Sequence, residues 1–200
     1  MTRAVAAGFT RRELPAAAIA SALGAAAGAP VAVAAGSASG DHQILAGTLR
    51  VERVVVWVYE RVLARGRLGP GARATVRLIL GHEREHVAAL ELALGGARTG
   101  EAPITLGAAE RELRRHHVGA SLLELGTQRD SLRLLVDVES MAEGAWFAAI
   151  ARLRAPGLAA LAAAIMASEA QHWTALSAIS HHGDPKISVP YPFVRGSGGY

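Results

Sequence analysis

Two glutamate–histidine pairs in this 200-residue chain have the spacing of metal ligands on a helix. Glu83 is followed three residues later by His86, and Glu169 is followed in the same way by His172. Residues three apart lie on one helical face, so each pair presents a carboxylate and an imidazole together. Oxygen and nitrogen ligands of this kind suit iron and manganese. Each pair therefore predicts part of a metal site, if a helix carries it.

Two other glutamates extend this pattern. Glu52 precedes Glu83 by nearly the interval that separates Glu139 from Glu169, so the chain consists of two similar units. One glutamate from each of two helices, together with Glu-x-x-His from each of two others, is the ligand set of di-iron and di-manganese carboxylate proteins. An aromatic residue follows seven positions after the first glutamate of each unit, and these residues are Tyr59 and Trp146.

These four glutamates stand where a helix would bury its apolar face. At about 100° per residue, Leu49, Val55 and Tyr59 share the face of Glu52, and Glu83, Glu139 and Glu169 have similar apolar neighbours. A single buried carboxylate can be protonated or hydrogen-bonded. Four on separate helices would repel one another at a cost of several kcal/mol each unless they shared a cation. The pattern predicts metal ions at their centre.

Four long helical patterns position these residues. Prolines, glycines and a capping aspartate, Asp41, set their ends. Short links make the first two and the last two helices antiparallel neighbours, and the long segment 95–126 joins the pairs. Within it, residues 106–125 form an amphipathic piece that predicts one or two short helices. The sequence predicts an all-α, ferritin-like four-helix bundle of two antiparallel hairpins joined by a long crossover. The helices are expected over residues 41–64, from after 70–71 to 95–96, over 127–154, and from 156 to near 183.

Composition excludes several other classes of site. The chain has no cysteine, which rules out disulfides, thiolate zinc sites, iron–sulfur clusters and a cysteine nucleophile. Its net charge of +4 over 200 residues gives no case for nucleic-acid binding. A metal site in this chain would use carboxylate and imidazole ligands.

The two ends differ from the middle. Residues 1–40 contain a basic head with Arg11 and Arg12, an alanine-rich apolar stretch over residues 15–35 and small residues at 32–34. These features predict an export signal and linker and resemble a twin-arginine signal, with an uncleaved anchor or a plain alanine-rich tail as alternatives. Residues 183–200 are rich in glycine and proline. They predict a non-helical tail in which residues 189–194 pack as an extended strap.

Over residues 41–182 the chain resembles the ferritin-like superfamily, particularly exported bacterial ferritin-like domain proteins with a twin-arginine signal. The resemblance implies two metal ions, iron or else manganese, and dioxygen or peroxide as the partner in oxidising Fe(II) or turning over peroxide. It also implies that Glu83 and Glu169 bridge the ions, and it is compatible with a homo-oligomer. The protein would reach the periplasm, cell surface or exterior through the export machinery. The implied metal ligands are Glu52, Glu83, His86, Glu139, Glu169 and His172.

Several alternatives stay open. His82, Glu83 and His86 also spell His-Glu-x-x-His, the string of zinc metalloproteases, although the extended zinc motif is absent and Ser168 replaces His82 in the second unit. His82 would otherwise orient a metal ligand from outside the site. Glu143 is a secondary candidate for a bridging ligand, and Tyr59 an auxiliary donor of an electron or a hydrogen bond. An alternative function is a non-catalytic, surface or stress-associated helical bundle.

Overall fold

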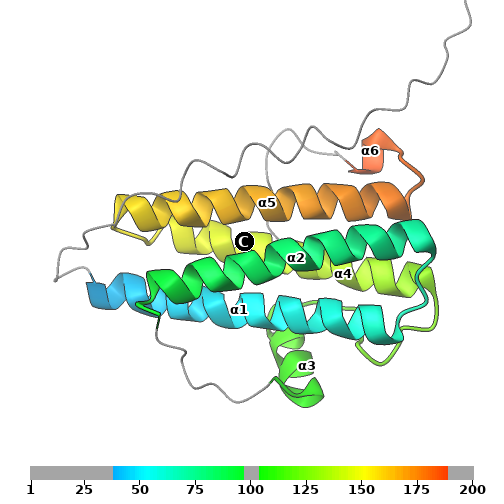
Figure 1. Cartoon of the computed structure of the whole chain (residues 1–200), viewed down its shortest axis with the longest axis horizontal. Helices are drawn as coiled ribbons and strands as arrows, with labels where there is room; N and C mark the ends of the chain where they lie inside the picture. Colours follow the sequence, from blue (N-terminus) through cyan, green and yellow to red (C-terminus); the bar gives the residue numbers. More distant parts are fainter. Residues whose placement is uncertain (1–37, 97–103, 189–200) are drawn as a thin grey trace, which may run out of the picture. The chain divides into compact units, whose positions relative to one another are not determined.

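A computed structural model describes residues 38–96 and 104–188 of the chain. Every regular element in this part of the chain is a helix, which confirms the all-α fold class (Figure 1). The helices are α1 (Ala38–Arg65), α2 (Pro70–Ala93), α3 (Leu106–Arg115), α4 (Gln128–Ile150), α5 (Pro156–Ser180) and α6 (Pro185–Ser188).

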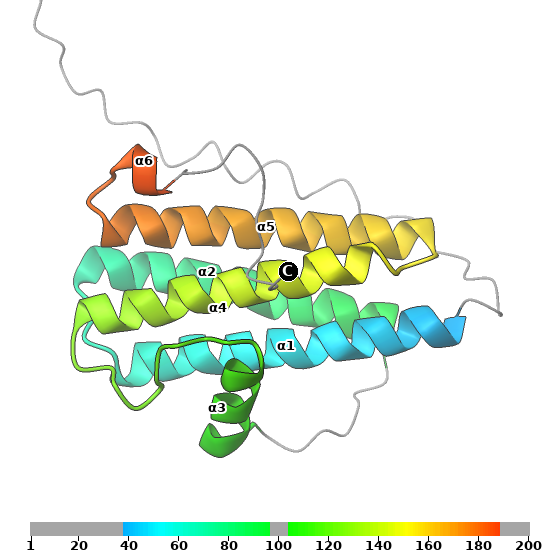
Figure 2. The ribbon, with the colours of Figure 1, turned by 180° about the vertical axis from the view of Figure 1, so that it is seen from behind.

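The four long helices form a bundle of two hairpins. Helix α1 contacts α2 and α4 contacts α5, while α1 also contacts α4 and α2 contacts α5. The two hairpins therefore lie against each other and enclose a common interior (Figures 1 and 2). The crossover carries α3, which packs against α1, and α6 packs against α5. A single short helix thus forms where residues 106–125 predict one or two.

Local signals set the helix ends. Pro70 and Pro156 each stand in the first turn of a helix, where the missing N–H costs nothing. Thr127 and Asp130 form a capping box at the start of α4. Gly95 and Gly96, with φ of 89° and 69°, follow α2 in a conformation that favours glycine.

The structure corrects the role of Asp41. Helix α1 begins at Ala38, so Asp41 lies within its first turn and does not cap it. Its buried carboxylate accepts hydrogen bonds from the backbone N–H groups of Arg154, at 3.1 Å, and Ala155, at 2.8 Å. These contacts hold the α4–α5 turn against α1. Helix α4 accordingly ends at Ile150, earlier than the predicted residue 154.

The prediction that residues 183–200 contain no helix is wrong for Pro185–Ser188, which form α6. The Asp184 carboxylate accepts a hydrogen bond from the backbone N–H of Lys186 at 2.9 Å, and this contact supports the single turn. The predicted strap at 189–194 and the export segment lie outside the described residues. None of the described helices is long and apolar enough to cross a membrane.

The buried core is divided in two along the bundle. One cluster includes Val55, Tyr59 and Leu135, and the other includes Leu49 and Trp146. On α1, Glu52 stands between Leu49 of one cluster and Val55 of the other. A polar layer therefore interrupts the apolar interior at the level of the buried glutamates.

Candidate metal centre

The bundle buries one glutamate from each long helix at this polar layer. Glu52 lies on α1, Glu83 on α2, Glu139 on α4 and Glu169 on α5, and each is 0% exposed. The two histidines of the Glu-x-x-His pairs, His86 and His172, are also buried. The structure thus brings together all six residues that the sequence proposes as metal ligands.

These six residues form two overlapping groups. His86 and Glu52 belong to one group and His172 and Glu139 to the other, while Glu83 and Glu169 belong to both. Within each group the candidate ligand atoms lie within 4.8 Å of one another. Glu83 and Glu169 are thus the two residues that offer ligand atoms to both groups.

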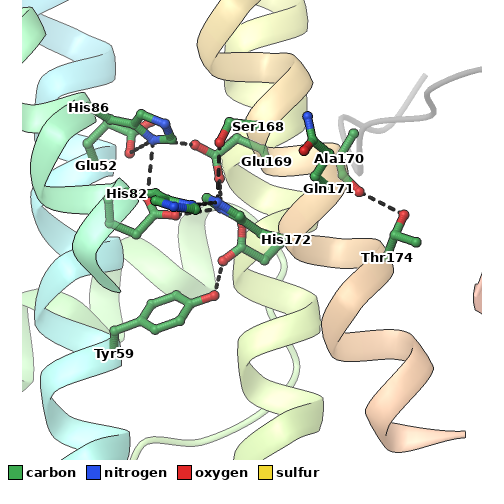
Figure 3. Close-up of polar contacts among 12 residues, drawn as sticks. Glu52, Tyr59, His82, His86, Ser168, Glu169, Ala170, Gln171, His172 and Thr174 are labelled. Atoms are coloured by element: carbon green, nitrogen blue, oxygen red, sulfur yellow. Dashed lines mark hydrogen bonds and ion pairs between the residues drawn. The ribbon is translucent and has the colours of Figure 1, made fainter. Parts of the chain in front are cut away.

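Each histidine reaches across to the shared glutamate of the opposite helix. Nδ1 of His86 lies 2.9 Å from Oε1 of Glu169 (Figure 3). Nδ1 of His172 lies 2.8 Å from Oε1 of Glu83. The arrangement is reciprocal between α2 and α5. Both imidazoles therefore present Nδ1 to the carboxylate layer.

Outside their contacts with one another, the inward-facing atoms of this cluster have no hydrogen-bond partner among the described residues. Such a buried polar atom costs free energy unless a metal ion or another group satisfies it. The donor set of carboxylate oxygen and imidazole nitrogen fits iron or manganese. The atoms are Oε2 of Glu52 and Glu139, both carboxylate oxygens of Glu83 and Glu169, and Nδ1 of His86 and His172.

The electrostatics of the cluster also call for positive charge. Burial raises the pKa of Glu52 and of Glu169, and the Glu83 carboxylate raises both further. Burial alone would raise the pKa of Glu83 as well, but hydrogen bonds with His172 and His86 lower it to about 2. Burial alone would lower the pKa of His172, but the surrounding carboxylates raise it to about 11. Glu52, Glu169 and His172 thus favour their protonated forms, as expected of a buried group of carboxylates and imidazoles whose net negative charge no cation balances.

Two aromatic residues hold the unshared glutamates. The Tyr59 hydroxyl on α1 donates to Oε1 of Glu139 on α4, and the Trp146 indole N–H on α4 donates to Oε1 of Glu52 on α1. Burial and the nearby Glu139 carboxylate raise the pKa of Tyr59, so its hydroxyl stays protonated as a donor. Each pair leaves Oε2 of the glutamate free to face the cluster. The matched spacing from glutamate to aromatic residue was visible in the sequence, but the crossed pairing between helices was not.

His82 lies outside both groups. Its Nδ1 is 3.0 Å from Nε2 of His172, on the side of that ring away from the carboxylates (Figure 3). A zinc protease would need His82 and His86 to bind one ion. Here His86 instead joins three glutamates. Ser168, whose hydroxyl is 3.2 Å from the same Nε2 atom, was not singled out as a site residue from the sequence.

Glu143, the secondary bridging candidate, is also buried but belongs to neither group. It lies one turn beyond Glu139 on α4. Burial raises the pKa of its carboxyl, and Glu139 raises it further. Its assistance to the metal site stays a prediction.

Comparison with known proteins supports the same fold. Residues 40–182 match the family model described as a ferritin-like domain. No curated protein and no solved structure shows a significant match to the chain. The family match spans more than half of the chain and includes all four long helices from residue 40 onward, with every candidate ligand. The chain belongs to the ferritin-like domain family.

Proposed function

We propose that this chain is a carboxylate-bridged di-metal protein that binds two iron ions and oxidises Fe(II) or turns over peroxide, with manganese as the alternative metal. The observation that supports this most directly is the pair of overlapping ligand groups that share Glu83 and Glu169. Four glutamates carry the charge needed to balance two divalent ions. Glu52 and His86 would complete one metal position, and Glu139 and His172 the other.

Two bound iron ions would supply the redox chemistry, each Fe(II) losing one electron as peroxide takes up two electrons and two protons to give two waters. The chain's own residues would bind the two ions and orient the carboxylates that hold them. Tyr59 and Trp146 hold one oxygen of Glu139 and of Glu52, so the other oxygen is aimed inward. The apolar clusters on both sides of the layer exclude bulk water, which strengthens charge interactions inside it.

Metal loading tests this proposal. Purified protein, stripped with a chelator, is incubated anaerobically with excess Fe(II) or Mn(II), desalted and assayed for metal by mass spectrometry. The ligand count predicts two ions per chain. Admitting air or peroxide to the Fe(II)-loaded protein is expected to oxidise the iron, measured as a gain in near-ultraviolet absorbance. Fewer than about one ion per chain contradicts the di-metal site. Two ions without oxidation contradict the redox function and favour the non-catalytic bundle.

We also propose that the chain is exported by the twin-arginine route. Arg11 and Arg12, followed by the apolar stretch at 15–35 and small residues at 32–34, support this. Replacing both arginines with lysine is expected to keep the chain in the cytoplasm, because the paired arginines are the feature that this route reads. Fractionation of cells expressing either form measures the effect. The matched control is Arg3→Lys, and equal export of all forms contradicts the twin-arginine route.

A further inference from the structure

The two metal positions differ in what holds their histidine. Nε2 of His172 lies 3.0 Å from Nδ1 of His82 and 3.2 Å from the Ser168 hydroxyl. Within the described part of the chain, Nε2 of His86 has no corresponding contact. The unshared carboxylates are matched, since Glu139 and Glu52 each accept from one aromatic donor. The difference therefore lies at the imidazoles.

The extra contacts to the His172 imidazole come from two residues at equivalent positions in the two similar units of the chain. His82 and Ser168 each stand four residues before the histidine of their own helix, His86 or His172. Ser168 contacts its own histidine. His82 instead reaches from α2 to α5 and stacks on His172, with ring centroids 5.3 Å apart (Figure 3). The side chains of His82 and Ser168 thus both contact the imidazole of His172.

The hydrogen-bonding roles follow from the orientation of the ring. Nδ1 of His172 faces the shared and unshared carboxylates. A histidine that binds metal through Nδ1 must carry its proton on Nε2 and donate from there. His82 Nδ1 and the Ser168 hydroxyl oxygen are the acceptors within reach. Such an outer contact fixes the tautomer and the orientation of the ligand ring, and losing one lowers metal affinity by about 10- to 100-fold.

We propose that His82 and Ser168 are positioning residues for His172, and that the Glu139–His172 position therefore fills before the Glu52–His86 position. This inference rests on the proposed two-metal function. The His172 ring is held at both nitrogens before an ion arrives, whereas the His86 ring is held at Nδ1 alone among the described residues and keeps more freedom to reorient. Ordering a side chain on binding reduces affinity.

Calorimetric titration of the chelator-stripped protein with Co(II), in the absence of air, tests the order of filling. The wild type is expected to bind two ions in two resolved steps. His82→Ala is expected to weaken the first step by about 10- to 100-fold and to leave the second unchanged. His82→Asn is expected to restore the first step, because an amide oxygen can accept the proton where Nδ1 does. Gln171→Ala is the matched control, since among the described residues this exposed neighbour of His172 hydrogen-bonds to the backbone of its own helix and to no ligand.

Two further variants show which metal position each binding step belongs to. Glu139→Gln is expected to remove the tighter step, and Glu52→Gln the weaker one. The inference is overturned if the wild type binds two ions with equal affinity, if His82→Ala weakens both steps equally or neither, or if His82→Asn fails to restore the first. A wild type that binds no Co(II), Fe(II) or Mn(II) overturns the two-metal function and this inference with it. Melting temperatures of the metal-free variants, expected to match the wild type, separate these outcomes from misfolding.

Discussion

Replacing Glu169 with glutamine is expected to abolish tight binding of both metal ions, whereas replacing Glu139 is expected to remove only one. Glu169 belongs to both ligand groups, while Glu139 belongs to one. Losing a contact outside the ligand set already lowers metal affinity by about 10- to 100-fold. Loss of a shared ligand should therefore weaken each of the two ions by on the order of 100-fold or more. Metal content after loading and desalting is the measurement.

The glutamine variant also separates metal binding from folding. It keeps the volume of the side chain, and burial raises the pKa of Glu169 so that its neutral form is already favoured without metal. The metal-free variant should therefore be about as stable as the metal-free wild type. Glu85→Gln is the control, because Glu85 is an exposed residue of α2 close to Glu83 in sequence and outside both groups. Equal loss of metal from the Glu169 and Glu139 variants would contradict the bridging assignment. So would a Glu169→Gln protein that still holds two ions.

The sequence was sufficient to single out the six candidate ligands that the structure brings together, because the relevant signal is local. A glutamate within an apolar stripe, such as Glu52 between Leu49 and Val55, is recognisable from helical periodicity alone. The repeated interval from the first glutamate to the Glu-x-x-His pair then indicated that all four glutamates lie at the same height along the bundle. The division of the ligands into two groups with two shared members followed only from the three-dimensional arrangement.

Contacts between residues far apart in the chain could not be predicted in this way. Asp41 resembles a helix cap in the sequence, yet its partners are backbone groups at Arg154 and Ala155. His82 sits beside its own His86 by helical spacing, yet contacts His172 on another helix. In both cases the choice of partner depends on how the hairpins pack, and periodicity within one helix carries no information about that. The sequence-based zinc-protease alternative arose from the same limitation.

Metal-free protein is expected to lose stability as the pH rises from 6 to 8, and metal-loaded protein is expected to gain it. Without metal, the buried cluster holds protons that the unfolded chain releases. Burial raises the pKa of Glu52 and Glu169, and the carboxylates around His172 raise its pKa to about 11. Groups with a raised native pKa contribute stability that is lost as the pH rises through that pKa.

The size of this effect follows from the number of excess protons. Each proton held only by the native state lowers the free energy of unfolding by about 1.4 kcal/mol per pH unit. The pKa of His82 is lowered by burial and by His172, so this residue opposes the trend. The lowered pKa of Glu83, about 2, makes a contribution to stability that is constant between pH 6 and 8 and changes only at lower pH. His172 alone is therefore expected to give a decline approaching about 1.4 kcal/mol per pH unit above pH 6.5, and the raised pKa values of Glu52 and Glu169 act in the same direction.

Metal binding reverses the sign because metal ions and protons compete for the same atoms. In the loaded native state His86 and His172 carry no proton on Nδ1, whereas histidines of the unfolded chain bind protons below about pH 6.5. The unfolded state then holds the excess, so stability rises with pH. Free metal at about 1,000 times the dissociation constant adds about 4 kcal/mol per site, which makes the loaded protein the more stable form.

Urea unfolding at several pH values, with chelator or with Mn(II), measures how stability changes with pH in the metal-free and in the loaded protein. In the double variant Glu52→Gln, Glu169→Gln the two carboxyls that hold protons are fixed in a neutral form, so its metal-free slope should be shallower than that of the wild type. Parallel slopes with and without metal would mean that the buried acids do not face the ions, which would contradict the assignment of the cluster as the metal centre.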